Sequence, residues 1–166
     1  MRGIRAALVR FHAFDNDMTE TRPAAAWNNV NSDVVSQFRS DNGKISSGMF
    51  KGARLLLLTT KGAKSGKERI NPLAYTRDGD NYVVIASKGG SPTHPDWYHN
   101  ILANPEVGVE VATPSGVEQF AARARIAQGE ERQRLYDAQA AIMPNFAEYQ
   151  KKTSREIPVV VLEPRR

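Results

Sequence analysis

The feature that most constrains the fold of this chain is a series of short apolar or alternating segments joined by tight turns. Six such segments occur, at residues 53–60, 68–77, 81–87, 106–112, 116–126 and 157–164. Asp78-Gly79, a hairpin signal, follows the second segment, and TPSG joins the fourth and fifth. Connections this short cannot hold the crossover that parallel strands need. Consecutive strands therefore pair antiparallel, which excludes the parallel sheet of a dinucleotide-binding fold.

Helical patterns occur before, between and after these strands, at residues 24–39, 95–103 and 129–152. Pro144 interrupts the last of them. Six antiparallel strands are enough to curl into a small barrel, which removes exposed sheet edges. Pro72 cannot donate to a sheet ladder, so it favours an edge or a bulge in the second strand. We predict one domain over 1–166, mainly β with flanking helices, built on a six-stranded antiparallel barrel with a helical N-terminal extension over 1–40.

Composition narrows the chemistry that the chain can perform. It has no cysteine, which excludes disulfides and thiolate metal sites. Its three histidines show no HExxH or other close metal-ligand spacing, so we expect no metal. The net charge of +5 favours a polyanionic partner, which could be nucleic acid, anionic lipid or a phosphorylated small molecule. No apolar run approaches the ~20 residues of a membrane span.

The N-terminal stretch MRGIRAALVRFHAF, residues 1–14, is a candidate basic amphipathic helix, because its apolar residues fall near helical spacing among arginines. Arg5 and Arg10 break its apolar character, so it does not resemble a signal peptide. Two interpretations stay open. The segment is a helix docked on its own domain or a frayed end, or it contacts a membrane surface peripherally.

The turn after the first strand is strongly cationic. Within TTKGAKSGKERINPLAY, residues 59–75, four cations fall in nine residues: Lys61, Lys64, Lys67 and Arg69. The turn is not a P-loop, because only three residues separate its glycines and a strand follows it. A glycine-rich turn can still present backbone N–H groups to an anion, with lysine as a mobile charge and arginine as a planar fork. The alternative is a solvated turn whose lysines keep a sheet edge soluble.

A second patch, ASKGGSPTHPDWYHN, covers residues 86–100 and leaves the third strand through paired glycines. Paired glycines let a flat ligand approach the backbone closely. Trp97 and Tyr98 follow on a short helix, where Trp97 either fills the core or faces a ligand. His94 and His99 have no cysteine or paired acid nearby, so we interpret both as ordinary surface or pocket residues.

Taken together, these patches resemble the deazaflavin-dependent nitroreductase family. Its members are split β-barrels, related to FMN-binding barrels, that use coenzyme F-420, an 8-hydroxy-5-deazaflavin. The resemblance spans residues 48–164 and rests on three stretches in order, LLLTTKGAKSGKERINPL, VIASKGGSPTHPDWYHNILANPEV and MPNFAEYQKKTSREIPVVVLEP. The cofactor carries a phosphodiester and an oligoglutamate tail. The resemblance therefore implies that the cationic turn faces a polyanion.

The resemblance also implies which residues contact the cofactor. The phosphate and the acidic tail would be held by Ala63, Lys64, Ser65, Gly66 and Arg69. The strand would continue beside the cofactor through Ile70, Asn71 and Pro72. The deazaflavin ring would lie against Ile85, Ala86, Ser87 and Lys88. The other side of the tail pocket would be closed by Asp96, Trp97, Tyr98, His99 and Asn100.

The activity implied by the resemblance is hydride transfer from the reduced ring to an acceptor, without a protein nucleophile or a metal. Tyr149 and Ser87 would be the candidate proton donors. Met143 and Phe146 stand where nitroimidazole-reducing members carry tyrosines, so a flat and fairly apolar quinone suits the pocket better. We expect an F-420-dependent reductase of quinones or nitro compounds, cytoplasmic and either monomeric or homodimeric. If residues 1–14 bind lipid, it would lie at the inner membrane face.

Other classes of function remain as alternatives. A non-catalytic F-420 carrier would bind the cofactor without reducing an acceptor, and an FMN-binding reductase would share the barrel. A nucleic-acid-binding module would use the lysine cluster. Trp97 and Tyr98 do not interleave with the cations as base-stacking platforms do, so we expect no nucleic-acid partner.

Overall fold

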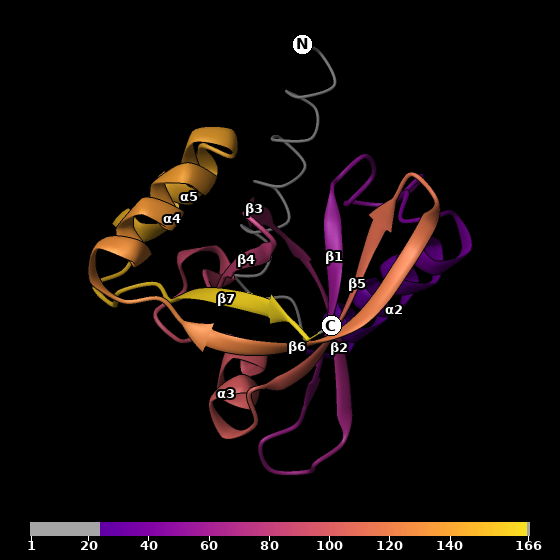
Figure 1. Ribbon diagram of the computed structural model, residues 1–166, viewed down its shortest axis with the longest axis horizontal. Coiled ribbons are helices and arrows are strands. Elements are labelled where there is room, and N and C mark those ends of the chain that lie inside the picture. The colour runs from indigo at the N-terminus through magenta and orange to yellow at the C-terminus, as the bar shows by residue number, and fades with distance from the viewer. Residues whose placement is uncertain (1–23, 166) are drawn as a thin grey trace.

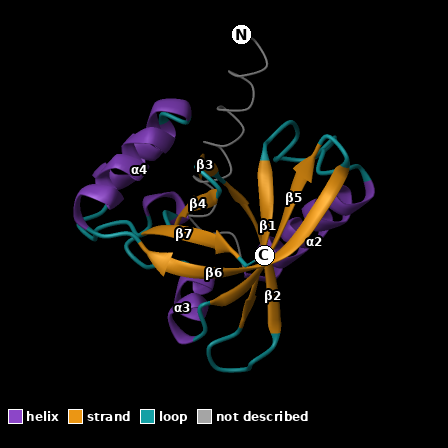
Figure 2. Ribbon diagram, viewed as in Figure 1, coloured by secondary structure: helices purple, strands orange, loops and turns teal. Residues whose placement is uncertain are grey.

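Strands far apart in the sequence meet in one curled sheet, with helices packed around it (Figures 1 and 2). The computed structural model describes residues 24–165, with side chains from residue 30 onward. The elements in chain order are α2 (Ala24–Ser40), β1 (Leu55–Lys61), β2 (Glu68–Ala74), β3 (Thr76–Asp78), β4 (Asn81–Ile85), the 3-10 helix η1 (Lys88–Gly90), α3 (Asp96–Ala103), β5 (Glu106–Thr113), β6 (Gly116–Ile126), α4 (Gly129–Ile142), α5 (Asn145–Lys151) and β7 (Val159–Pro164).

Within residues 24–165 the sheet has seven strands in the order β2-β1-β5-β6-β7-β4-β3, and all neighbours are antiparallel. β2 and β3 lie at its two ends, although only Tyr75 separates them in the chain. The sheet must therefore curl until its ends meet at Tyr75, as a half-closed barrel. The predicted fold class is confirmed, as is the edge position of Pro72. The segment expected as one strand over 68–77 divides at Tyr75, which gives seven strands instead of six.

The apolar run of β1 is buried on both faces of the sheet. Leu55, Leu56, Leu57 and Leu58 are each at most 2 % exposed. Leu56 and Leu58 belong to the cluster inside the barrel, whereas Leu55 and Leu57 pack in the cluster under α2. A strand covered on both faces shows an unbroken apolar run, and each buried leucine contributes roughly 1.5–3 kcal/mol. This burial fixes β1 and therefore the turn that follows it.

The helices cover the sheet in separate places, which Figure 1 shows. α2 packs on the β1–β2 side through Val34 and Phe38. α3 packs against the barrel interior through Trp97 and Ile101. α4 and α5 cover β4 and β7, and the break between these two helices lies at Pro144, as predicted. The β1–β2 hairpin consequently emerges between α2 and α3.

Within residues 24–165, no helix combines the length and the apolar character that a bilayer crossing requires. The amphipathic helix expected over 1–14 lies outside the described residues.

Candidate cofactor site

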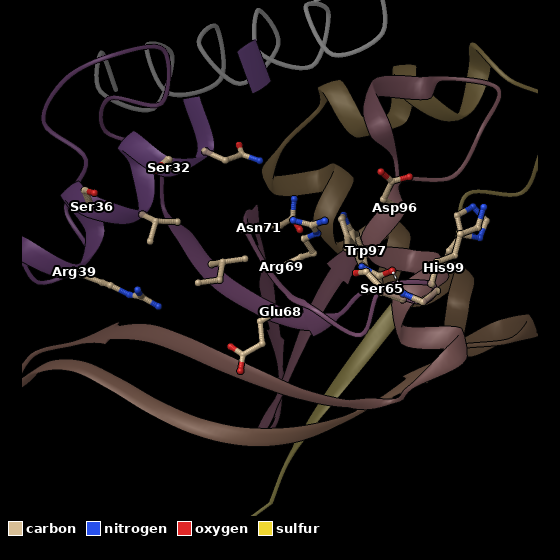
Figure 3. Close-up of a pocket in the computed structure, with 17 residues that line it drawn as sticks. Ser32, Ser36, Arg39, Ser65, Glu68, Arg69, Asn71, Asp96, Trp97 and His99 are labelled. Carbon is tan, nitrogen blue, oxygen red and sulfur yellow. Dashed lines mark hydrogen bonds between the residues drawn. The ribbon is translucent and has the colours of Figure 1, made fainter. Parts of the chain in front are cut away.

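A cleft of about 1070 Å³ follows β2, with α2 on one side and α3 on the other. We call it the β2 cleft. Figure 3 shows Ser32, Ser36 and Arg39 of α2 on one side of the cleft and Asp96, Trp97 and His99 of α3 on the other, with Arg69 and Asn71 of β2 between them. The lining residues are Asn31, Ser32, Val35, Ser36, Arg39, Gly62, Ala63, Lys64, Ser65, Glu68, Arg69, Ile70, Asn71, Asp96, Trp97, His99 and Asn100. Known ligand pockets span about 300–1,000 Å³, so this cleft suits a large, elongated ligand.

The cationic turn at the end of the cleft has a defined internal structure. Gly66 lies in the left-handed region, with φ +69°, and its N–H donates to the carbonyl of Gly62 at 2.9 Å. The N–H of Lys67 donates to Ser65 Oγ at 3.2 Å. A Cβ at Gly62 would lie 2.6 Å from the same Oγ, so a larger residue there would displace the Ser65 side chain from this bond. The N–H groups of Lys64 and Ser65 have no acceptor within residues 24–165 and are therefore available to an anion.

Asn100 connects the turn to α3. It is 7 % exposed, and its Oδ1 accepts the N–H of Ala63 at 2.9 Å. Its Nδ2 donates to Thr60 Oγ1 at 3.1 Å. Both the oxygen and the nitrogen of the Asn100 side-chain amide are therefore hydrogen-bonded within the protein. Asn100 holds the turn in position, and the N–H of Ala63 is not available to a ligand. The prediction placed both residues at the cofactor without this division of roles.

The cleft carries charges of both signs. The side chains of Lys64 and Arg69 are exposed and form no ion pair with any residue in the described part of the chain. Glu68 and Asp96 line the cleft as well. The cleft-lining cations without an ion-pair partner in the described part of the chain are therefore Lys64 of the turn and Arg69 of β2, where the resemblance placed the phosphate and acidic tail.

α2 contributes a polar wall that was not predicted as part of the site. Arg39 donates to both carboxylate oxygens of Glu110, from Nε at 2.9 Å and from Nη2 at 2.8 Å. Glu110 on β5 is 5 % exposed, so the pair fixes the end of α2 to the sheet. The signal in the sequence was a helix with Ser32 and Ser36 opposite its apolar face. That signal indicates a solvated face as readily as a binding wall.

The loop after β4 lies outside the β2 cleft. Ile85, Ala86, Ser87 and Lys88 are absent from its lining, as are Gly66, Pro72 and Tyr98. Ala86 shares the interior apolar cluster with Trp97. Trp97 is 4 % exposed, so it fills the core and also borders the cleft. The residues predicted to contact the ring therefore do not line the β2 cleft.

His94, Tyr98 and His99 form an aromatic group beside this loop. The ring centroids of His94 and Tyr98 are 4.7 Å apart, and those of His94 and His99 are 5.8 Å apart. Burial lowers the pKa of His94 below its usual value, and the charges of Arg155 and His99 add to this. Burial also raises the pKa of Tyr98. Near pH 7, His94 is therefore neutral and Tyr98 protonated.

The two predicted proton donors occupy different environments. Tyr149 is fully buried, packs edge-on against Phe146 with ring centroids 5.1 Å apart, and accepts a hydrogen bond from Asn145 Nδ2. Ser87 is 6 % exposed and comes directly before Lys88, whose φ of +45° lies in the left-handed region. Neither residue lines the β2 cleft.

The fold and this cleft can be compared with known proteins. A family model described as F-420H(2)-dependent quinone reductase matches residues 31–164. The chain belongs to this family. An F-420H(2)-dependent quinone reductase of Mycobacterium tuberculosis (strain ATCC 25618 / H37Rv) is 41 % identical over 128 residues, which cover 75 % of this chain and 83 % of that protein.

Solved structures agree with the family assignment. A structure described as an F-420-H2 dependent reductase is 43 % identical and has a TM-score of 0.59, covering 67 % of this chain and 95 % of the other. A structure described as a domain-swapped dimer is 35 % identical with a TM-score of 0.62, covering 85 % of this chain and 100 % of the other. The predicted family, the split-barrel fold, the reductase activity and coenzyme F-420 as cofactor are confirmed.

Proposed function

We propose that this F-420H(2)-dependent quinone reductase family member transfers a hydride to a quinone, and that its β2 cleft binds the acidic tail of the cofactor. One observation carries the second part. Lys64 and Arg69 line a cleft of about 1070 Å³ without an ion-pair partner in the described part of the chain. Unpaired cations beside free N–H groups form an anion site.

The donors of the cleft fit the group that they would hold. Arg69 offers a planar fork for phosphate or carboxylate oxygens, and Lys64 offers a mobile point charge. The N–H groups of Lys64 and Ser65 add two neutral donors at the turn. Glu68 and Asp96 repel an anion from the neighbouring parts of the cleft and so confine it to the turn.

When bound, the cofactor supplies the hydride, and the quinone gains this hydride and one proton to become the hydroquinone. The protein contributes position and shelter from water. Buried Trp97 and Ala86 close the barrel interior between the cleft and the loop after β4. Of the two proton-donor candidates we favour Ser87, because Tyr149 is enclosed in its own apolar cluster.

We propose a quinone in preference to a nitroimidazole as acceptor. Phe146 is 3 % exposed and belongs to the cluster of apolar side chains under α4 and α5, and Met143 packs against this cluster. Neither side chain offers a hydroxyl that could orient a nitro group. Phe146 is enclosed in this cluster as Tyr149 is, so only the partly exposed Met143 can border an acceptor. An apolar border binds a flat hydrocarbon ring without leaving a polar group unpaired.

The test is anaerobic turnover of the purified full chain with reduced F-420 and menadione, followed by the absorbance of the oxidised deazaflavin. We expect menadione-dependent oxidation, and slower turnover of a bicyclic nitroimidazole. Cofactor binding without menadione reduction would instead identify a carrier. Tight binding of FMN but not of F-420 would identify a flavin reductase. Nitroimidazole turnover equal to that of menadione would refute the acceptor preference.

We also propose that the protein is cytoplasmic and either monomeric or homodimeric. We further propose that residues 1–14 contact the inner face of the membrane. The basic amphipathic pattern of that segment supports the membrane contact. In a co-sedimentation assay with anionic vesicles, the full chain should sediment with the vesicles, whereas a variant that begins after residue 14 should stay in the supernatant. Equal retention of the two would refute the contact.

A further inference from the structure

We propose that Arg155 is a positioning residue for the loop after β4 and orients the backbone donors that meet the cofactor ring. The inference rests on the proposed function and on the ring contact of residues 85–88 that the resemblance implies. Arg155 lies between α5 and β7, more than sixty residues from the loop in the sequence. The resemblance gave it no role.

One guanidinium group reaches four residues of this loop. Arg155 Nε donates to the carbonyl of Ser91 at 2.8 Å, and Nη2 donates to the carbonyl of Ser87 at 2.8 Å. Nη1 donates to the carbonyl of Ala86 at 3.3 Å and contacts His94 Nδ1 at 2.9 Å. The planar fork therefore fixes both ends of the segment 86–94 at once, which a lysine with one nitrogen cannot do.

The contact with His94 defines the protonation of that ring. A guanidinium has donors only, so His94 Nδ1 must accept and the proton of the neutral ring must lie on Nε2. The lowered pKa of His94 agrees with this neutral state. The loop is thus held by a fully matched set of donors and acceptors.

The carbonyl contacts determine where the opposite side of each peptide points. The described chain has no cis peptide, and in a planar trans peptide the N–H points away from the C=O. With the carbonyls of Ala86 and Ser87 directed at Arg155, the N–H groups of Ser87 and Lys88 face the other way. Neither N–H has an acceptor within residues 24–165. They form a pair of adjacent donors suited to an oxygen or nitrogen of a heterocyclic ring.

The loop needs such a constraint because its backbone is strained. Lys88 adopts φ +45° although it carries a side chain, and Gly90 packs so closely on α5 that a Cβ would lie 2.8 Å from the carbonyl oxygen of Tyr149. Strained conformations persist only where the surroundings over-determine them. Arg155 is itself held, since Gln150 Nε2 donates to its carbonyl at 2.8 Å.

The charge of Arg155 is not cancelled locally. Its hydrogen-bond partners are three carbonyls and the His94 ring, and no carboxylate within residues 24–165 forms an ion pair with it. Its field acts on the two peptide groups directly and polarises their N–H donors. This effect distinguishes a positioning role from simple packing, because a neutral side chain of similar size would keep the packing and lose the polarisation.

The test compares Arg155→Gln and Arg155→Lys with Arg134→Gln. Arg134 lies on α4 and forms an ion pair with Asp78 at the surface. Arg134→Gln removes one positive charge, as Arg155→Gln does. The F-420 dissociation constant, measured by fluorescence titration, should rise about tenfold or more in Arg155→Gln, the effect of losing one well-placed hydrogen bond or more. It should change by less than about twofold in Arg134→Gln. Hydrogen exchange of the cofactor-free protein should accelerate at 87–94 in Arg155→Gln only.

Each outcome bears on the proposal. A lower melting temperature with the same dissociation constant in Arg155→Gln and Arg134→Gln would overturn it, because Arg155 would then only stabilise the fold. If Arg155→Gln does not fold, Arg155→Lys decides, and binding equal to wild type overturns it. If the wild-type protein does not bind F-420, the proposed function fails, and the exchange rates at 87–94 still test whether Arg155 holds the loop.

Discussion

Replacing Arg69 with alanine should weaken F-420 binding about tenfold. Arg69 lies on β2 opposite Thr60 and lines the cleft without an ion-pair partner in the described part of the chain. A hydrogen bond to a charged group contributes roughly 1.5–3 kcal/mol. Because the Arg69 side chain is exposed, solvent screening places the effect at the lower end, and 1.4 kcal/mol corresponds to about a factor of ten.

Lys67→Ala is the matched control for this substitution. Lys67 lies in the same turn and carries the same charge, but it does not line the cleft. Titration of cofactor fluorescence at low and high salt separates two effects. Long-range attraction is common to both variants and fades once the Debye length falls below about 10 Å. The direct contact is lost only in Arg69→Ala. The weaker binding that results from this loss should therefore remain at high salt. Equal losses in the two variants, or no loss in either, would show that the acidic tail lies elsewhere.

Three further predictions concern stability. Asn100→Ala leaves the N–H of Ala63 and a buried hydroxyl unpaired, so urea unfolding should show a loss of roughly 1–3 kcal/mol, and an unchanged midpoint would contradict the assigned role. Arg39→Met strands the buried carboxylate of Glu110, so the loss should be about 3 kcal/mol, the low end for a broken buried pair because Arg39 is half exposed, and adding Glu110→Gln should recover part of it. Burial, with a neighbouring guanidinium, lowers the pKa of His94, so the unfolded chain binds the proton of this residue more readily than the folded chain does. The free energy of unfolding should therefore fall as pH drops below about 6.5. His94→Gln should reduce this fall, and identical pH profiles of stability for the variant and the wild type would argue against the assignment.

The strands and turns could be predicted because their signals are local. Residues that alternate, the Asp78-Gly79 turn and Pro144 each act on their immediate neighbours, and each appears where it was expected. The division at Tyr75 could not be predicted. The pattern over 68–77 is continuous, and only pairing with β1 on one side and β4 on the other separates it into two strands. That information lies in contacts between distant residues.

The candidate site divides in the same way. The cationic turn was visible because like charges crowded into a few residues need a partner or solvent. The assignments of Ile85 and its neighbours to the ring came from resemblance and stay predictions. The α2 wall and Arg155 were not visible, because a serine on a helix face or one arginine in a loop gives no local signal. Their roles arise from carbonyls and carboxylates that the fold brings from far along the chain.

The junction at Tyr75 has a consequence for the protein in the absence of its cofactor. The continuous segment of β2, Tyr75 and β3 supplies both edge strands of the sheet. If this segment detached, the backbone N–H and C=O groups of β1 and β4 would be exposed together and could pair with another molecule. A ligand seated along β2 opposes that detachment by mass action, in proportion to the logarithm of its concentration over its dissociation constant. Scarcity of the redox cofactor would therefore promote aggregation and proteolysis in addition to slowing turnover.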